Sequence, residues 1–294
     1  KVNEQKRIEI EADRILRLFS NSGAQIVQPA VLQRADTLLD LYGEDIRARA
    51  YVTSDPFNGK MMLRPDFTVP IVKTHMTGET GNDTARYAYC GKVFRRQEKN
   101  SERASEYLQV GYEIFDRTDV IKSDTDVFCI IKKALGDLPL RVATGDIGIL
   151  MTAVSSLKTT SSRQKALLRH LWRPQRFLAI LEKFTNEVSV SIERFDGFQA
   201  EKSFANQAKE IGLRSKSEII ERIENLLQDS KEAPISTTEL DVINSLLNIG
   251  DKCPEALIKL RDLLTDMPAL GSAIEKFEKR LSALDNANVD LSSI

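Results

Sequence analysis

The sequence predicts an α+β protein, with an antiparallel sheet and flanking helices in the first half and a mostly helical second region. Two observations carry this prediction. Residues 86–115 form two arms in which polar and apolar side chains alternate, which is typical of a strand hairpin. After about residue 151, apolar residues recur at helical spacing and strand patterns almost vanish. With 294 residues, 41% of them hydrophobic, the chain can bury a sizeable core.

The region before the hairpin alternates between helix and strand patterns. An amphipathic stripe predicts a helix over residues 6–18, which Gly23 ends. The further predicted elements are a strand at Ile26 and Val27 closed by Pro29, a helix over 35–42, strands over 49–53 and 61–64, and a helix over 68–76 with Thr68 as its N-cap.

The region after the hairpin begins with a predicted helix over 124–135, capped by Asp124 or Thr125, and a strand over 140–144. Gly145 and Asp146 then turn into another helix. Helical spacing predicts six later helices, over 163–185, 201–211, 217–228, 237–248, 254–264 and 270–284.

A polar run at residues 159–162 marks the expected domain boundary. We therefore expect a core over 1–157 and a helical region or insertion over 158–294. Val289, Asp290 and Leu291 predict the start of a strand that returns to the sheet. The core is thus expected to resume near residue 289 and to be truncated where the sequence stops.

Composition excludes several classes of protein. A net charge of −1 produces no global attraction to nucleic acid or to an anionic membrane, and no apolar run approaches the roughly 18 residues of a membrane span. Cys90, Cys129 and Cys253 lack metal-ligand or disulfide spacing and indicate reduced thiols. We expect a cytoplasmic protein with no metal, no cofactor, no nucleic acid and no membrane partner.

The hairpin carries a candidate ligand site. Successive strand residues point to opposite faces, so Gln109, Gly111 and Glu113 share one face. Arg95, at the end of the facing strand, could bind a carboxylate or phosphate with two hydrogen bonds. A glycine inside a strand marks a place where a ligand or another backbone comes close. The alternative is a solvated strand face on which Arg95 pairs with surface acids.

The hairpin resembles motif 2 of the class II aminoacyl-tRNA synthetases, in particular the histidyl branch. The stretch from Phe94 to Glu113 aligns without a gap with the histidyl pattern FRxERPxxGRxREFxQxGxE, and LRPDFT at residues 63–68 is similar to LRPEGT. The resemblance implies a class II synthetase-like sheet and a vestigial histidine pocket lined by Asp66, Thr68, Arg95, Gln109 and Glu113.

Residues 24–29 are similar to motif 1, a dimer-interface element that ends in a proline. The resemblance therefore implies a homodimer through residues 6–29, in agreement with the apolar stripe of Ile8, Ile15 and Phe19. The alternative is that this stripe packs on the sheet of its own chain.

The departures from the histidyl pattern concentrate in the loop that faces ATP in the synthetases. Gln97 replaces a glutamate, and Glu98 and Ser105 replace arginines. Asp66 and Phe67 stand where LRPEGT has glutamate and glycine. This combination resembles the regulatory subunits of ATP phosphoribosyltransferase, synthetase paralogues that have lost aminoacylation and serve the first step of histidine biosynthesis.

That second resemblance implies a subunit without catalytic residues. It would bind the short-form ATP phosphoribosyltransferase catalytic subunit, as a homodimer within a hetero-oligomer, and respond to free histidine. The alternative is a true histidyl-tRNA synthetase, which makes histidyl-adenylate and charges tRNA. The altered loop and the net charge of −1 favour the regulatory subunit.

Overall fold

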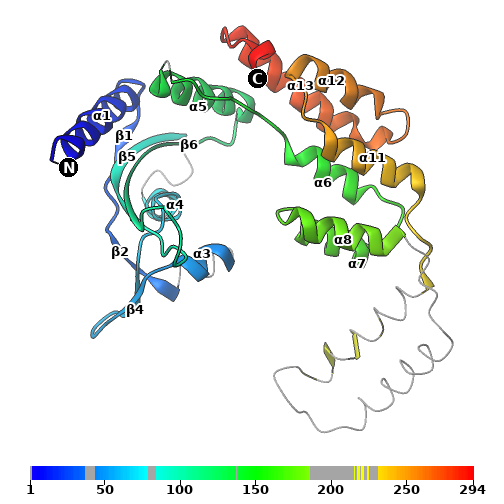
Figure 1. Cartoon of the computed structure of the whole chain (residues 1–294), viewed down its shortest axis with the longest axis horizontal. Helices are drawn as coiled ribbons and strands as arrows, with labels where there is room; N and C mark the ends of the chain where they lie inside the picture. The colour runs from blue at the N-terminus through cyan, green and yellow to red at the C-terminus, as the bar shows by residue number, and fades with distance from the viewer. Residues whose placement is uncertain are drawn as a thin grey trace. The chain divides into compact units, whose positions relative to one another are not determined.

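The computed structural model describes residues 2–36, 44–78, 84–136, 138–185 and 231–294, with a few single positions between 215 and 224. It divides into two compact units, Lys1–Pro139 and Leu140–Ile294, the first mixed and the second helical (Figure 1). The predicted helices over 35–42, 201–211 and 217–228 lie wholly or largely outside the described residues. No helix in the described part of the chain is long and apolar enough to cross a membrane.

The first unit is built on a three-stranded sheet in the order β1-β5-β6. Strand β1 (Gln25–Ile26) runs parallel to β5 (Ala85–Phe94), which pairs antiparallel with β6 (Glu106–Phe115). The β5–β6 register runs from Ala85 opposite Phe115 to Phe94 opposite Glu106. Both arms of the predicted hairpin and the short strand before it are confirmed.

Helices cover the two faces of this sheet (Figure 1). On one face, α1 (Val2–Asn21) and α5 (Val120–Leu135) pack through a core that includes Phe19 and Tyr112, whose ring centroids lie 5.3 Å apart. On the other face, α4 (Thr68–Thr77) packs against Tyr87 and Tyr89. The alternation read from the sequence thus places the two sets of side chains on opposite faces, as expected.

The apolar stripe of α1 divides between two environments. Phe19 is buried, and Ile15 packs partly buried against the same core. Ile8 is 45% exposed. The C-terminal half of the stripe therefore stabilises the fold of its own chain, and the N-terminal half is available to a partner.

A second sheet has the antiparallel order β2-β4-β3, from β2 (Leu32–Arg34), β4 (Gly59–Leu63) and β3 (Val52–Asp55). Its hairpin turn is tight because Asp55 accepts hydrogen bonds from the backbone N–H groups of Phe57 and Asn58, which also lower the pKa of Asp55. The strand predicted over 49–53 begins later than expected, since α3 (Glu44–Arg49) occupies the residues before it.

Two predicted helix caps are wrong. Asp119, not Asp124 or Thr125, caps α5, and its carboxylate accepts the N–H of Lys122 at 2.9 Å. The N-cap of α4 is Phe67, and Thr68 is the first helical residue. The Thr68 hydroxyl is then free to bond elsewhere, which matters for the site described below.

The second unit is helical, as predicted. Its elements are α6 (Ile147–Ser155), α7 (Ser161–Arg169), α8 (Pro174–Thr185), α11 (Thr237–Asn248), α12 (Cys253–Asp262), the 3₁₀ turn η1 (Pro268–Leu270), α13 (Gly271–Asn286) and the 3₁₀ turn η2 (Leu291–Ser293). The single helix predicted over 163–185 is two helices, because Pro174 lacks an N–H and restrains the residue before it.

Two predicted strands do not form among the described residues of this unit. Residues 140–144 have no ladder partner there. Residues 291–293 form η2, in which the carboxylate of Asp290 accepts the N–H of Ser292 at 3.0 Å. The predicted boundary between residues 157 and 158 falls between α6 and α7, within this unit. The reading of 158–294 as an insertion stays a prediction.

Candidate functional site

The predicted pocket residues lie on the α4 side of the hairpin and at the start of α4. The Thr68 hydroxyl donates a hydrogen bond to a Glu113 carboxylate oxygen at 2.9 Å. This bond joins the first turn of α4 to β6. It forms because Thr68 is inside the helix and does not cap it.

Tyr89 links the polar groups of this face, and the sequence reading did not include it. Its hydroxyl oxygen accepts a hydrogen bond from the Gln109 amide at 3.2 Å and also bonds with Glu113. The structure thus brings Thr68, Gln109 and Glu113 together around the Tyr89 phenol. The register explains the placement, since Tyr89 lies directly opposite Gly111, midway between Gln109 and Glu113.

The Tyr89 ring covers Gly111. A Cβ atom built on Gly111 would lie 2.1 Å from that ring, which only glycine avoids. The sequence predicted that a ligand or another backbone comes close to this glycine. The group that comes close is instead the Tyr89 side chain of the neighbouring strand. Aromatic rings often pack over a cross-strand glycine in this way.

Phe67 and Arg64 continue the cover across the face. The Phe67 ring stacks on Tyr89 with centroids 4.2 Å apart, and the Arg64 guanidinium carbon lies 4.0 Å from the Phe67 centroid. A Cβ on Gly91 would meet both Arg64 and Phe67, at 2.5 and 2.9 Å. We call Arg64, Phe67 and Tyr89 the aromatic layer. It occupies the space over both glycines of the hairpin.

The other two predicted residues lie at the edge of this cluster. The charge of Asp66 raises the pKa of Glu113 and of Tyr89, so its carboxylate is within electrostatic range of both. Arg95 donates from Nε to the backbone oxygen of Pro65 at 2.8 Å, next to Asp66 in the chain. Arg95 therefore anchors the segment that precedes α4.

Burial governs the protonation of the cluster. It raises the pKa of Glu113, an effect that Asp66 reinforces and the Thr68 and Tyr89 hydrogen bonds oppose. Burial and the Glu113 charge raise the pKa of Tyr89 to about 12. The phenol therefore remains a hydrogen-bond donor at neutral pH.

Replacing Glu113 by glutamine is expected to change how stability depends on pH. Because the pKa of Glu113 is higher in the folded state, the free energy of unfolding should fall as pH rises from the ordinary carboxyl range through the raised pKa. Glu113→Gln removes this contribution. Urea unfolding of both proteins at pH values from about 4 to 7 measures it, and Glu102→Gln in the exposed loop is the control. A wild-type-minus-variant difference that is constant over this range contradicts the expectation.

Replacing Gly111 by alanine should destabilise the hairpin by about 1–3 kcal/mol, because the Tyr89 ring must move away from the new methyl group. Gly250→Ala is the matched control, since a Cβ there meets nothing within 4 Å. Urea unfolding of the two variants tests the packing of Tyr89 over Gly111. Equal midpoints would show that the ring does not lie there.

The loop between the hairpin strands is held by its own side chains and by α3. Gln97 donates from Nε2 to the backbone oxygen of Ala104 at 3.3 Å. Arg96 donates its side chain to the backbone oxygen of Ala48 at 2.5 Å and its N–H to that of Arg49 at 2.8 Å. The part of the chain that the structure describes contains no group of three or more His, Cys, Asp or Glu residues able to hold a metal ion.

The sheet, the hairpin and the LRPDFT segment define a protein with a class II aminoacyl-tRNA synthetase fold. A family model described as histidyl-tRNA synthetase matches residues 2–293, and the chain belongs to that family. The predicted fold class is confirmed.

Solved structures with a similar fold include two that bear directly on this chain. One is an ATP phosphoribosyltransferase regulatory subunit/histidyl-tRNA synthetase from Bacillus halodurans, with a TM-score of 0.63 and 15% identity over 99% of this chain and 63% of its own length. The other is histidyl-tRNA synthetase from Nostoc sp. PCC 7120, with a TM-score of 0.53 and 14% identity over 97% of this chain and 55% of its own.

Curated relatives distinguish the two branches suggested by the sequence. The chain is 29% identical to the ATP phosphoribosyltransferase regulatory subunit of Agrobacterium fabrum, over 96% of this chain and 79% of the relative. It is 27% identical to the protein of the same name from Brucella canis, over 92% and 76%. The similarity to regulatory subunits that the loop departures predicted is therefore confirmed.

Proposed function

We propose that this chain is a non-catalytic regulatory subunit of ATP phosphoribosyltransferase, which binds the short catalytic subunit and activates the first step of histidine biosynthesis. The observation that carries the proposal is the similarity to proteins of that name over 96% of the chain. The histidyl-tRNA synthetase family model is consistent with it, since it matches the same residues.

The geometry of the hairpin supports a non-catalytic role. Adenylate formation requires positive groups that stabilise the charge shifting onto phosphate oxygens in the transition state. The loop has Gln97, Glu98 and Ser105 at the positions that depart from the histidyl pattern, and Gln97 bonds within the loop. Phe67 fills space above Gly91 that the glycine of LRPEGT would leave open.

The five predicted residues are, in this proposal, the remains of an amino-acid pocket. Asp66 and Glu113 are the carboxylates suited to an ammonium group, and free histidine is the ligand class. The hydroxyl of Tyr89 now bonds with Gln109 and Glu113. Histidine that bound here would compete with this hydroxyl for hydrogen bonds to Gln109 and Glu113.

The proposed function is tested by mixing this chain with the short catalytic subunit from the same organism. Activation means that the active conformation of the catalytic subunit binds this chain more tightly than the inactive one does. We expect the two proteins to co-elute and the rate of phosphoribosyl-ATP formation to rise about 5- to 150-fold, the usual range of coupling energies. If the two proteins do not co-elute and the rate does not change, the proposal is overturned.

The second candidate function is histidyl-tRNA synthetase activity, which the family model keeps open. Histidine-dependent exchange of pyrophosphate into ATP separates the two functions. We expect no exchange above an Arg95→Ala control. Exchange above that control would establish adenylate chemistry and replace the regulatory assignment.

We further propose that the chain forms a homodimer within the hetero-oligomer. The exposed Ile8 on α1, at the N-terminal end of the apolar stripe, supports an interface at that end of the helix. Light scattering of the isolated chain gives its mass, and a monomer at micromolar concentration would contradict the dimer. The cytoplasmic location expected from the three free cysteines stays a prediction.

A further inference from the structure

The sequence around the turn between α7 and α8 lacks acidic residues. Residues 147–181 contain six lysines and arginines and no aspartate or glutamate, whereas the whole chain has nearly equal numbers of the two kinds, 42 and 43. Five of the six cations are exposed, and the sixth, Arg163, is buried and donates to the backbone oxygen of Ala233 at 2.9 Å. The net charge of −1 therefore conceals a local positive patch.

Four exposed cations and a tryptophan lie at the turn itself. Lys165 and Arg169 are one helical turn apart on α7 and share a face, and Arg176 lies in the first turn of α8. Trp172 is 75% exposed, although tryptophan is highly buried on average. We call the five residues of this surface the basic corner: Lys165, Arg169, Trp172, Arg173 and Arg176.

The basic corner stands on a well-packed helical hairpin. The neighbouring helices α7 and α8 are consecutive elements of one compact unit (Figure 1). Through the turn, the N–H of Arg173 donates to the backbone oxygen of His170 at 2.9 Å. Because the surface is preformed, a partner would lose little free energy in ordering it. The apolar side chains of the hairpin that are buried are Leu167, Leu171, Phe177 and Leu181.

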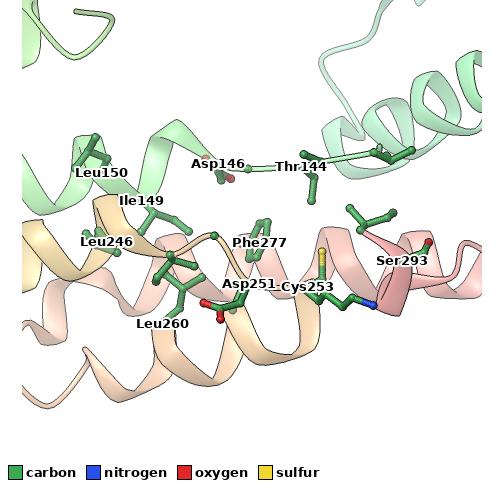
Figure 2. Close-up of a pocket in the computed structure, with 18 of the residues that line it drawn as sticks. Thr144, Asp146, Ile149, Leu150, Leu246, Asp251, Cys253, Leu260, Phe277 and Ser293 are labelled. Carbon is green, nitrogen blue, oxygen red and sulfur yellow. The ribbon is translucent and has the colours of Figure 1, made fainter. Parts of the chain in front are cut away.

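Acidic side chains elsewhere in the same unit already pair with other cations. Figure 2 shows Asp146 and Asp251 at a cavity of about 450 Å³, whose lining contains no residue of the basic corner. Asp146 pairs with Arg280 at 2.8 Å, and Asp251 pairs with Lys259 at 2.6 Å. These carboxylates therefore do not neutralise the corner.

The charge of the basic corner is uncompensated. Within the described ranges, Lys165, Arg169 and Arg176 form no ion pair. The first turn of α8 contains no acidic residue, so Arg176 lies near the partial positive charge of the helix N-terminus. This placement is unfavourable for the helix itself, and such local conflicts are expected at functional sites. A carboxylate bound at the corner would relieve the conflict.

We propose that the basic corner binds an acidic peptide segment of a partner protein. Carboxylates of the segment pair with Arg169 and Arg176, and an apolar side chain beside them packs on the Trp172 indole. Arginine suits this role because its planar guanidinium can donate two hydrogen bonds to one carboxylate. The inference rests on the surface of α7 and α8 and not on the proposed function, so either can fail alone.

A protein segment fits the basic corner better than a single-stranded nucleic acid does. Binding of single strands uses a positive groove that follows the backbone and several aromatic side chains on which successive bases stack. The corner has one aromatic side chain, Trp172, and its cations flank a single turn. Tryptophan and arginine are the residue types that dominate the binding energy at protein–protein interfaces.

The fluorescence of Trp172 tests the proposal on the whole chain, because it is the only tryptophan of the protein. Acrylamide should quench it as readily as a free indole side chain. Protection in the chain alone would show that another part of the chain covers the corner, and protection that grows with protein concentration would identify a second copy as the occupant. Either result overturns the inference.

The binding probe is a short peptide of aspartate and glutamate with a central phenylalanine and leucine. We expect it to shift the Trp172 emission with a Kd below about 1 mM at low ionic strength. The same peptide with amides in place of its carboxylates should bind at least about 10-fold more weakly. No binding of the acidic peptide, equal binding of the amide peptide, or tighter binding of single-stranded oligouridylate overturns the proposal.

Arginine variants test which charges make the contact. The double variant Arg169→Gln, Arg176→Gln should bind the acidic peptide at least about 10-fold more weakly and lose most of the salt dependence of binding. Arg7→Gln, at an exposed position of α1, is the matched control and should bind as the parent does. Unchanged binding by the double variant, with its fold verified by circular dichroism, overturns the assignment.

The contribution of the indole is measured by calorimetry, because Trp172→Ala removes the fluorescent reporter. This variant should also bind the acidic peptide at least about 10-fold more weakly, as expected for an aromatic anchor. Phe57→Ala removes an aromatic ring that is 95% exposed on the other unit and should leave binding unchanged. Equal affinities of the two variants would show that the indole makes no contact and would overturn the proposal.

Discussion

Replacing Phe67 by alanine is expected to lower the free energy of unfolding by about 3–5 kcal/mol, the usual cost of deleting a buried phenylalanine ring. Phe67 is completely buried, stacks on Tyr89 and lies under the Arg64 guanidinium. Because Gly91 has no side chain that could move into the vacated space, we expect little relaxation. The cost should therefore lie toward the upper part of the range.

Urea unfolding followed by circular dichroism measures this cost. Phe57→Ala is the matched control, since Phe57 is 95% exposed at the turn between β3 and β4. That variant should change the free energy of unfolding by no more than about 0.5 kcal/mol. If Phe67→Ala cost as little as the control, the aromatic layer would not exist as described.

Replacing Arg64 by methionine should cost a similar amount, about 3–5 kcal/mol, for a different reason. Arg64 is 5% exposed, and its guanidinium donates to the backbone oxygens of Lys92, at 2.9 Å, and Pro29. Each hydrogen bond from a charged group is worth about 1.5–3 kcal/mol, and its loss leaves a carbonyl without this donor. Methionine can replace the apolar packing but not the donors.

The comparison with Arg64→Lys separates charge from geometry. Lysine keeps the positive charge but lacks the planar fork that reaches two carbonyls and stacks on Phe67. We expect it to recover less than half of the loss. Arg34→Met, at an exposed position of β2, should be near neutral in the same urea series. Full recovery by lysine would show that charge alone matters at this position.

The sequence was sufficient for the hairpin because its information is local. Alternation along residues 106–115 fixed which side chains face α1 and which face α4, and the structure agrees. It also placed Gln109 and Glu113 on one face. The alternation did not show that Tyr89 bonds with both Gln109 and Glu113. It defines the face on which a side chain lies but not the direction in which a long side chain turns.

The errors have equally specific causes. Asp119 was missed as the cap of α5 because Asp124 and Thr125 have the same chemistry a few residues later, and only the backbone selects between them. Phe67 is a departure from LRPEGT, as expected, but the sequence did not show where its ring lies, because that depends on Gly91, which is distant in the sequence. Residues 140–144 have the alternation typical of a strand, but a strand forms only beside a partner strand, and local sequence does not show whether one is present.

A backbone hydrogen bond joins the end of α8 to Ile235, the residue before the N-cap of α11. Ile235 donates its N–H to the backbone oxygen of Phe184 at 3.0 Å, and the Glu239 carboxylate accepts the N–H of Lys158 at 2.7 Å. Residues far apart in the sequence are therefore joined at this place by two backbone-anchored hydrogen bonds. The last turn of α8 and the start of α11 are thus held together by contacts between the described helices themselves, so a substitution at Glu239 is expected to be felt at Lys158, 81 residues earlier in the chain.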